Sequence, residues 1–288
     1  MIHEEGTFNG VKDHVLYYQC WLPEESEAEI VGTVQIVHGV AEHSGRYGNV
    51  LNTLVPAGYA CFAHDLYGHG KSNGMRKYVD KFEDYIEDQR IFKDFITAMH
   101  QELLEKPKFL LGHSMGALIA FYYATIYKHD FTGLILSGFG PRQIYNIPKI
   151  LLAIGPSLGP TLLSKAIFNS GLTADFVSRD PEVVKAYKED PLDCDISKFT
   201  GRLGGYYIRY GKAIPKNTAK VEEPLLVQVG SGDKFNTDFD KLEGLFTGTE
   251  DKTIKIYEGL YHEVYNEFPD DRAIVLNDLL EWIQKRTV

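Results

Sequence analysis

Short apolar runs alternate with longer amphipathic stretches along most of the chain. The runs at 31–37, 59–63 and 134–137 are rich in apolar and β-branched residues, as in strands that are buried on both faces of a sheet. Between such runs, apolar positions recur at helical spacing over 47–55 and 82–103. Strands that alternate with helices in this way predict the α/β class, with a mainly parallel sheet and helices on both of its faces.

The alternation stops between residues 141 and 215. An apolar stretch at 147–154 and a shorter one at 162–168 predict helices there instead of strands. We therefore expect a core domain made of 1–140 and 216–288, with a helical insertion between its two parts. Residues 141–215 are called the insertion below.

Both ends of the chain fit the expected core. Loose alternation over 6–22 around Asn9-Gly10 predicts a hairpin, with its second strand at 15–22. After the insertion, the pattern resumes with strands at 225–229 and 254–257 and a last helix at 272–286. The part of the chain after the insertion therefore repeats the alternation of strands and helices that the first half shows.

Composition narrows the classes of function. The chain has 288 residues and a formal net charge of -10, which argues against a nucleic-acid partner and against electrostatic attachment to an anionic membrane. Its three cysteines have no metal or redox spacing and are typical of free thiols in a reducing compartment. The first residues lack the pattern of a signal peptide, and no apolar run approaches the roughly 20 residues of a membrane span. We therefore expect a cytoplasmic protein.

Residues 112–116 read Gly-His-Ser-Met-Gly, with a predicted strand before them and a predicted helix after them. This is the arrangement of a nucleophile elbow, in which Ser114 lies on a strained turn with its Oγ exposed. Glycine is needed at 112 and 116 because a Cβ would crowd the neighbouring backbone of so tight a turn. Because the pentapeptide arises readily by chance, the strand and the helix beside it carry the prediction.

A nucleophilic serine needs a base that takes its proton and a carboxylate that orients the base. In this arrangement the chain order is serine, acid, histidine, and ligands bind beyond the C-terminal ends of the strands. Asp233 is the first carboxylate after the strand at 225–229, and His262 is the single histidine in the loop after the strand at 254–257. Asp238 is the weaker rival for the acid, because it resembles a helix N-cap.

Acyl transfer also needs two N–H donors for the oxyanion of the tetrahedral intermediate. One is the amide that follows the nucleophile, here Met115, and the other comes from an earlier strand end. Val40, directly after His38-Gly39, is the best candidate for the second donor. Both residues are apolar, which is compatible with the role because a backbone donor does not depend on its side chain.

Five segments together resemble the monoacylglycerol lipase and lysophospholipase family of α/β-hydrolases. The most specific is His-Gly-Val-Ala-Glu-His-Ser-Gly-Arg-Tyr at 38–47, and the others are at 65–72, 112–116, 230–233 and 255–263. They span the expected core almost from end to end. The resemblance implies the α/β-hydrolase fold.

The same resemblance implies a function and its residues. It implies a Ser114/Asp233/His262 triad, with Val40 and Met115 as oxyanion donors, that cleaves monoacylglycerols to fatty acid and glycerol through an acyl-enzyme without a cofactor. It also implies that the insertion is a mobile cap over an acyl-chain tunnel. The insertion resembles the family in its general character and carries none of the five matching segments. Because the cap determines the substrate, the resemblance defines the substrate less well than the reaction.

Several alternatives stay open at this point. Within enzymes, the substrate could be a lysophospholipid, a short-chain ester or a thioester, or the acyl group could pass to an alcohol instead of water. A non-catalytic ligand receptor is a different class, although such proteins usually lose part of the triad. An epoxide or halide hydrolase on this fold needs Asp at the elbow, so Ser114 excludes it.

Four further residues are candidates for contact with substrate. Glu42 and Arg46 follow the strand that leads to Val40; they either hold this loop by a salt bridge or backbone contacts, which we favour, or bind the polar head of the substrate. Ile150 and Leu151 belong to the apolar stretch at 147–154, which either packs inside the cap or docks transiently on a membrane.

We expect no catalytic metal. Four histidines lie in turn segments without the spacing of a ligand set such as H-E-x-x-H, namely His38, His64, His69 and His113.

Overall fold

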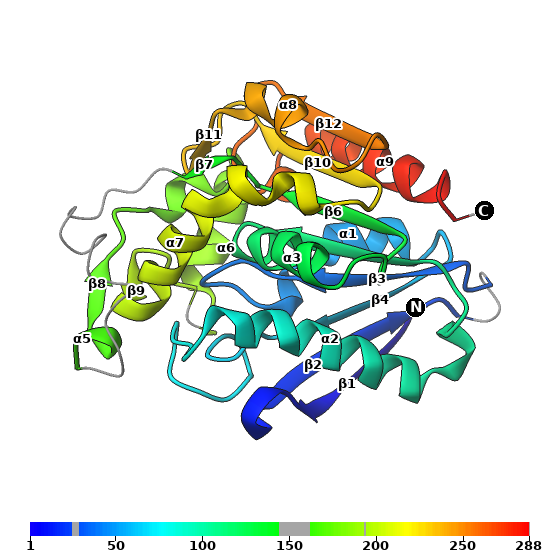
Figure 1. Cartoon of the computed structure of the whole chain (residues 1–288), viewed down its shortest axis with the longest axis horizontal. Helices are drawn as coiled ribbons and strands as arrows, with labels where there is room; N and C mark the ends of the chain where they lie inside the picture. Colours follow the sequence, from blue (N-terminus) through cyan, green and yellow to red (C-terminus); the bar gives the residue numbers. More distant parts are fainter. Residues whose placement is uncertain (25–28, 144–161, 193, 288) are drawn as a thin grey trace.

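The computed structural model describes residues 1–24, 29–143, 162–192 and 194–287. Within these residues an eight-stranded sheet forms the centre of the molecule (Figure 1). In spatial order its strands are β1 (Ile2–Asn9), β2 (Val15–Leu22), β4 (Tyr59–His64), β3 (Gly32–Val37), β5 (Lys108–His113), β6 (Gly133–Ser137), β10 (Leu225–Gly230) and β12 (Lys252–Tyr257). The strands from β4 to β12 pair in parallel, whereas β1 with β2 and β2 with β4 are antiparallel. The predicted α/β class is confirmed.

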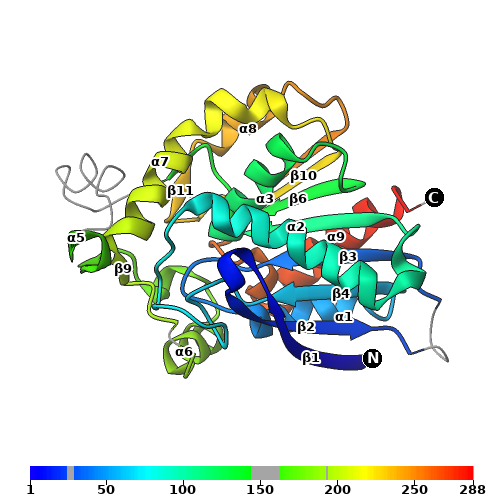
Figure 2. The same ribbon diagram turned by 60° about the horizontal axis from the view of Figure 1, so that its bottom comes forward.

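Helices cover both faces of the sheet, as Figures 1 and 2 show. On one face α1 (Gly48–Leu54) and α9 (Pro269–Gln284) pack with the sheet in one hydrophobic cluster. On the other face α2 (Phe82–Met99), α3 (Met115–Ile126) and the short α8 (Leu242–Leu245) share a second cluster. Strands buried from both sides need apolar residues at nearly every position, which explains the continuous apolar runs of the sequence.

The insertion leaves the carboxyl end of β6 and returns to β10, the strand beside β6 in the sheet. Figures 1 and 2 show the described part of the insertion at one end of the molecule. Its described elements are β7 (Arg142–Gln143), α5 (Leu162–Lys165), β8 (Ile167–Asn169), α6 (Pro181–Glu189), β9 (Lys198–Thr200) and α7 (Gly201–Asn217). β7 pairs with β11 (Asn236–Thr237), and α7 contacts α3, so the insertion joins the core at both of its ends.

Short 3-10 helices connect many of these elements. They are η1 (Val11–Asp13), η2 (Ser44–Arg46), η3 (Gln101–Leu103), η5 (Ala174–Phe176), η6 (Thr218–Lys220), η7 (Phe239–Lys241) and η8 (Val264–Asn266).

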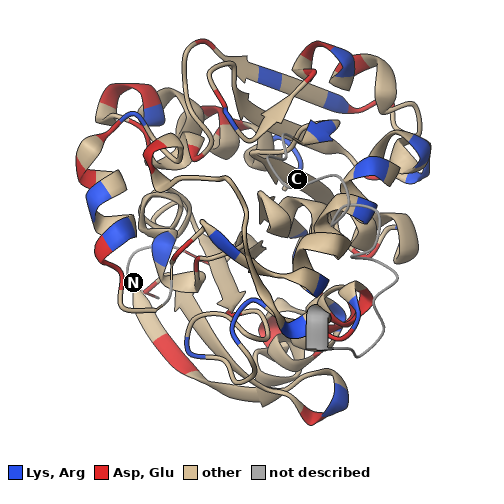
Figure 3. Cartoon of the chain, turned by 90° about the vertical axis from the view of Figure 1, so that its left-hand side faces the viewer, with Lys and Arg blue, Asp and Glu red and all other residues tan. Residues whose placement is uncertain are grey.

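Charged residues of both signs are dispersed over the described part of the face on which the insertion lies (Figure 3). Lys and Arg are interspersed there with Asp and Glu instead of forming a basic stripe. Among the described residues, we find no helix with the length and apolar character needed to cross a membrane.

Some predicted elements differ from the structure in extent. The predicted helix at 162–168 is wrong beyond Lys165, because residues 167–169 pair as β8 with β9. The helix predicted over 82–103 ends at Met99, where His100 leaves the helical conformation. The stretch at 147–154, with Ile150 and Leu151, lies outside the described residues.

Candidate active site

Ser114 lies at the junction of β5 and α3, in a backbone conformation with φ 54° and ψ -115°. This is a strained region for a residue with a side chain. Crowding on both sides holds the turn, since a Cβ at Gly116 would overlap the carbonyl oxygen of Val37 and one at Gly112 would overlap the backbone of Gly116. The Ser114 side chain is therefore presented at the carboxyl edge of the sheet by a turn that only glycine permits at these two positions.

Asp233 and His262 meet at the same edge, from the loops after β10 and β12. His262 Nδ1 lies 2.8 Å from Asp233 Oδ2, and both residues are buried. Asp233 also accepts hydrogen bonds from the Phe235 amide at 2.6 Å and from the Asn236 side chain at 3.2 Å. A carboxylate held by these donors fixes the imidazole with Nδ1 protonated, which leaves Nε2 as the nitrogen that can accept a proton.

The charges of the pair shift both of its pKa values. Burial alone would lower the pKa of His262, but the charge and hydrogen bond of Asp233 outweigh burial and raise it. Burial alone would raise the pKa of Asp233, but His262, with the Phe235 amide and Asn236, lowers it. The pair thus combines a carboxylate that stays ionised with an imidazole of increased basicity, as a general base requires.

The three residues predicted to act together all lie at this edge. His113, the residue before Ser114, places its ring 4.9 Å from the ring of His262, and a Cβ on Gly138 would lie 3.0 Å from His262 Cε1. Among the described residues, His262 Nε2 is buried without a hydrogen-bond partner. The structure therefore places Ser114, Asp233 and His262 in one neighbourhood with an open nitrogen on the histidine.

Tyr207 is a site residue that the sequence did not reveal. It lies on α7 of the insertion, and its hydroxyl interacts with the Ser114 side chain. Burial raises the pKa of Tyr207 to about 12, and the interaction with Ser114 opposes that rise, so the hydroxyl stays protonated at neutral pH. No motif surrounds this residue, and only its place on an amphipathic helix distinguishes it from other tyrosines of the chain.

The two candidate oxyanion donors lie in segments next to Ser114. Met115 is the first residue of α3, where the amides of the first turn have no partner within the helix. Val40 belongs to the loop after β3. Among the described residues, no backbone carbonyl accepts a hydrogen bond from its amide. This loop passes directly against the nucleophile, since a Cβ on Gly39 would lie 3.1 Å from Ser114 Cβ.

Glu42 and Arg46 form a buried network behind this loop. Arg46 Nη1 lies 3.2 Å from Glu42 Oε2, and the Arg46 guanidinium donates to both oxygens of Glu263 at 2.8 and 2.9 Å. Glu42 accepts a hydrogen bond from the Gly39 amide and another from the Tyr47 hydroxyl at 3.1 Å. These contacts are the salt bridge and the backbone contacts that the structural interpretation of the two residues requires.

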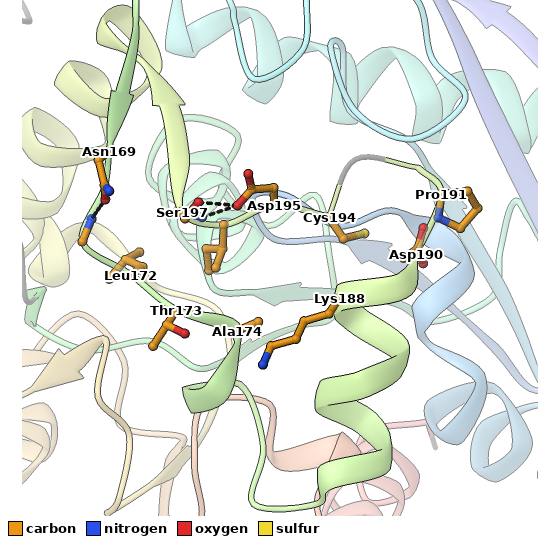
Figure 4. A pocket seen from close by; sticks show the side chains of 12 residues that line it. Asn169, Leu172, Thr173, Ala174, Lys188, Asp190, Pro191, Cys194, Asp195 and Ser197 are labelled. Atoms are coloured by element: carbon orange, nitrogen blue, oxygen red, sulfur yellow. Dashed lines mark hydrogen bonds between the residues drawn. The ribbon is translucent and has the colours of Figure 1, made fainter.

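One group among the described residues has the composition of a metal site: His43, Asp190 and Cys194. Asp190 and Cys194 lie on the wall of a pocket of about 740 Å³ within the insertion, which Figure 4 shows. However, His43 Nδ1 accepts from the Gly45 amide at 3.1 Å, so the proton is on Nε2, which faces Asp190 Oδ2 at 3.0 Å. Burial also raises the pKa of the Cys194 thiol. A protonated Nε2 and a thiol are hydrogen-bonding groups, and a metal needs the deprotonated forms of both.

Comparison with known proteins places the chain among hydrolases. The family model described as serine aminopeptidase, S33, matches residues 28–269. The monoacylglycerol lipase of Mycolicibacterium smegmatis is 35% identical over 97% of this chain and 96% of its own length. The monoglyceride lipase of Homo sapiens is 30% identical over 94% of this chain and 88% of its own length.

A solved structure of a monoacylglycerol lipase also matches this chain. The crystal structure of the Paleococcus ferrophilus monoacylglycerol lipase matches with a TM-score of 0.79 and 29% identity, over 94% of this chain and 99% of that one. The fold, the family model and the full-length relatives point to one group of proteins. The chain therefore belongs to the serine aminopeptidase S33 family of α/β-hydrolases, in the branch that includes the monoacylglycerol lipases.

Proposed function

We propose that this chain is a serine hydrolase that cleaves monoacylglycerols to fatty acid and glycerol through an acyl-enzyme on Ser114. The observation that carries the proposal is the buried Asp233–His262 pair, with His262 Nε2 open at the strand edge where Ser114 lies. The names of the two full-length relatives support the choice of substrate.

In the proposed reaction, His262 Nε2 takes the proton of Ser114 Oγ as the oxygen attacks the ester carbonyl. Asp233 keeps the imidazole in the required tautomer and stabilises the imidazolium that forms. The amides of Val40 and Met115 donate to the oxyanion, and glycerol leaves with the proton from His262. Water then attacks the acyl-enzyme by the same proton transfers, which releases the fatty acid and restores Ser114.

The insertion acts in this proposal as a cap over the acyl chain. Two observations support it: the insertion leaves the carboxyl end of β6 at the edge where Ser114 lies, and Tyr207 of α7 reaches the Ser114 hydroxyl. We further propose that the apolar stretch at 147–154 docks on lipid. If wild-type protein does not float with liposomes, and Ile150→Asp and Leu151→Asp leave turnover of micellar substrate unchanged, the docking proposal is wrong.

Ser114→Ala tests the proposed nucleophile. We expect turnover of a monoacylglycerol to fall on the order of a million-fold, and labelling by a fluorophosphonate probe to disappear. Ser231→Ala is the matched control, because Ser231 is an exposed serine in a neighbouring strand-end loop, and it should keep both activity and labelling. Labelling of the Ser114→Ala protein, or a folded wild type that is not labelled, would contradict the assignment.

A substrate panel tests the choice of substrate. Monoacylglycerols, diacylglycerols and lysophospholipids of varied chain length are compared by kcat/KM on the same preparation. We expect the monoacylglycerols to give the highest values. Faster hydrolysis of lysophospholipids would keep the serine hydrolase and replace its substrate.

A further inference from the structure

The loop at 39–42 carries the proposed oxyanion donor Val40, and its peptide groups are held from several directions. A peptide unit is planar, so a hydrogen bond to its carbonyl oxygen also fixes the direction of its N–H. His38 Nε2 accepts from the Leu66 amide at 2.8 Å, so its Nδ1 carries the proton and donates to Gly39 O at 2.7 Å. Gly39 O and the Val40 N–H belong to the same peptide unit, and His38 therefore orients the proposed donor.

The peptide unit before this one is held from within the loop. The Gly39 amide donates to the carboxylate of Glu42, which is itself buried and paired with Arg46. The loop thus closes on itself through a charged side chain of its own segment. These two supports belong entirely to the core domain.

The third support comes from the insertion. Tyr187 on α6 is almost completely buried, and its hydroxyl donates to Ala41 O at 2.7 Å. Ala41 has a φ of 53°, a left-handed conformation that residues with a Cβ rarely adopt and that persists only where the surroundings impose it. The hydroxyl of Tyr187 holds the carbonyl of this strained residue, directly beside Val40.

The ring of Tyr187 makes a second contact with the same network. The Arg46 guanidinium lies over it, with Cζ 4.5 Å from the ring centroid. Arg46 also binds Glu42 of the loop and Glu263, the residue after His262. One side chain of the insertion therefore contacts both the loop of the proposed oxyanion donor and the cation that links this loop to the segment of the proposed base.

We infer that Tyr187 is a positioning residue for the oxyanion hole, so that α6 must be seated on the core for the Val40 amide to reach its working direction. This inference rests on the proposed function. It assigns to the insertion a role in transition-state stabilisation in addition to covering the acyl chain. A group that acts through the oxyanion donor changes the stability of the transition state more than that of the bound substrate.

Tyr187→Phe removes only the hydroxyl and keeps the ring under Arg46. We expect kcat for a monoacylglycerol to fall about tenfold with KM within about twofold of wild type, because loosening a donor should cost less than deleting it. A trifluoromethyl ketone, which forms a tetrahedral adduct whose oxyanion needs the same donors, should bind more weakly by a similar factor.

Tyr206→Phe is the matched control. The Tyr206 hydroxyl also joins the insertion to a backbone carbonyl of the core, Asp80 O at 2.9 Å, but far along the chain from the loop at 39–42. We expect its kcat and its affinity for the ketone to stay near those of wild type. Thermal unfolding of both variants checks that each is folded.

Three results would overturn the inference. They are an unchanged kcat in folded Tyr187→Phe, a loss that appears only in KM, or equal losses in Tyr187→Phe and Tyr206→Phe. The last result would mean that seating of the insertion, and not the Ala41 contact, matters. Failure of the proposed function looks different, because wild-type protein would then hydrolyse no ester and take up no fluorophosphonate.

Discussion

His262 and Glu263 are neighbours in the chain, both are buried and each pairs with a charged side chain, yet the two pairs are built differently. The Asp233–His262 pair leaves one atom open, since His262 Nε2 has no partner among the described residues. The Arg46–Glu263 pair leaves no carboxylate oxygen open, because both oxygens accept from Arg46 and one also accepts from the Asn266 side chain at 2.9 Å.

The same difference appears in how each pair titrates. Burial alone would raise the pKa of Glu263, but Arg46 lowers it to about 2, so this carboxylate is charged at any pH near neutrality. The pKa of His262 is instead raised from an ordinary value near 6.5, towards the range in which a base exchanges protons under physiological conditions.

The comparison shows how reacting residues can be distinguished from positioning residues in a buried polar cluster. A buried polar atom without a partner is costly, and proteins keep few of them. Where one lies on a buried, hydrogen-bonded histidine at the strand edge that also carries a proposed nucleophile, as His262 Nε2 does, it indicates a candidate for proton transfer. Where every atom is satisfied, as at Glu263, the cluster indicates positioning.

Among the changes that test the two pairs, Asp233→Asn is expected to have the largest effect, which is on turnover. An amide cannot stabilise the imidazolium by charge and permits the wrong tautomer of His262, so we expect turnover to fall roughly ten-thousand-fold. Steady-state hydrolysis of a monoacylglycerol measures it, with circular dichroism as the check on folding.

Asp238→Asn is the matched control for this prediction. Asp238 is the rival acid from the sequence, and its side chain pairs with Lys241 at 2.8 Å instead of with a histidine. We expect nearly unchanged turnover. Retention of more than a few per cent of activity in Asp233→Asn, or a comparable loss in Asp238→Asn, would remove Asp233 from the proposed triad.

Glu263→Gln has its main expected effect on stability. It leaves the Arg46 guanidinium buried without its bidentate carboxylate, so we expect the free energy of unfolding at neutral pH to fall by about 3 kcal/mol. Urea unfolding followed by tryptophan fluorescence measures the change. Glu267→Gln breaks a similar pair with Arg179 and is expected to cost less, because the Arg179 side chain is 28% exposed and that of Arg46 is 10% exposed.

The pH dependence of this loss gives a second check. The folded-state pKa of Glu263 is lowered from an ordinary 4.5 to about 2, so its stabilising contribution is complete above about pH 4.5 and is lost as the pH falls towards 2. The difference between wild type and Glu263→Gln should therefore narrow over that window. A difference that is small at neutral pH, or constant down to pH 2, would show that Arg46 does not depend on Glu263.

The sequence predicted the fold of the core well because its strands are buried on both faces. Runs such as 31–37 and 59–63 have no alternative that buries them, and β3 and β4 lie where expected. Short elements were less predictable, since tertiary pairing decides them. Residues 167–169 form β8 because 198–200 lies beside them, which no local pattern could indicate.

Some residues of the candidate site could also be predicted from the sequence, and others could not. Ser114, Asp233 and His262 could be selected because each follows a strand, and chain topology brings strand ends together. Tyr207 and Tyr187 could not, because both lie on helices of the insertion whose contact with the core depends on how that segment folds over the sheet. Periodicity indicates the buried face of such a helix, but it does not indicate which side chain reaches a particular carbonyl or hydroxyl.

The smallest expected effect is a shift in the pH profile, and it tests whether the two pairs influence each other. Only neutral His262 can accept the Ser114 proton, and its pKa is raised, so kcat/KM of wild type should fall on the acidic side with an apparent pKa above 6.5. The charge of Glu263 contributes to that rise, so Glu263→Gln should move the acidic limb to lower pH. Arg46, left with Glu42 as its remaining carboxylate, should move the limb in the same direction. Glu267 is not among the main causes of the raised His262 pKa, so Glu267→Gln should move the limb less than Glu263→Gln does. A limb that stays fixed or moves to higher pH in Glu263→Gln would mean that the group titrating in the reaction is not His262.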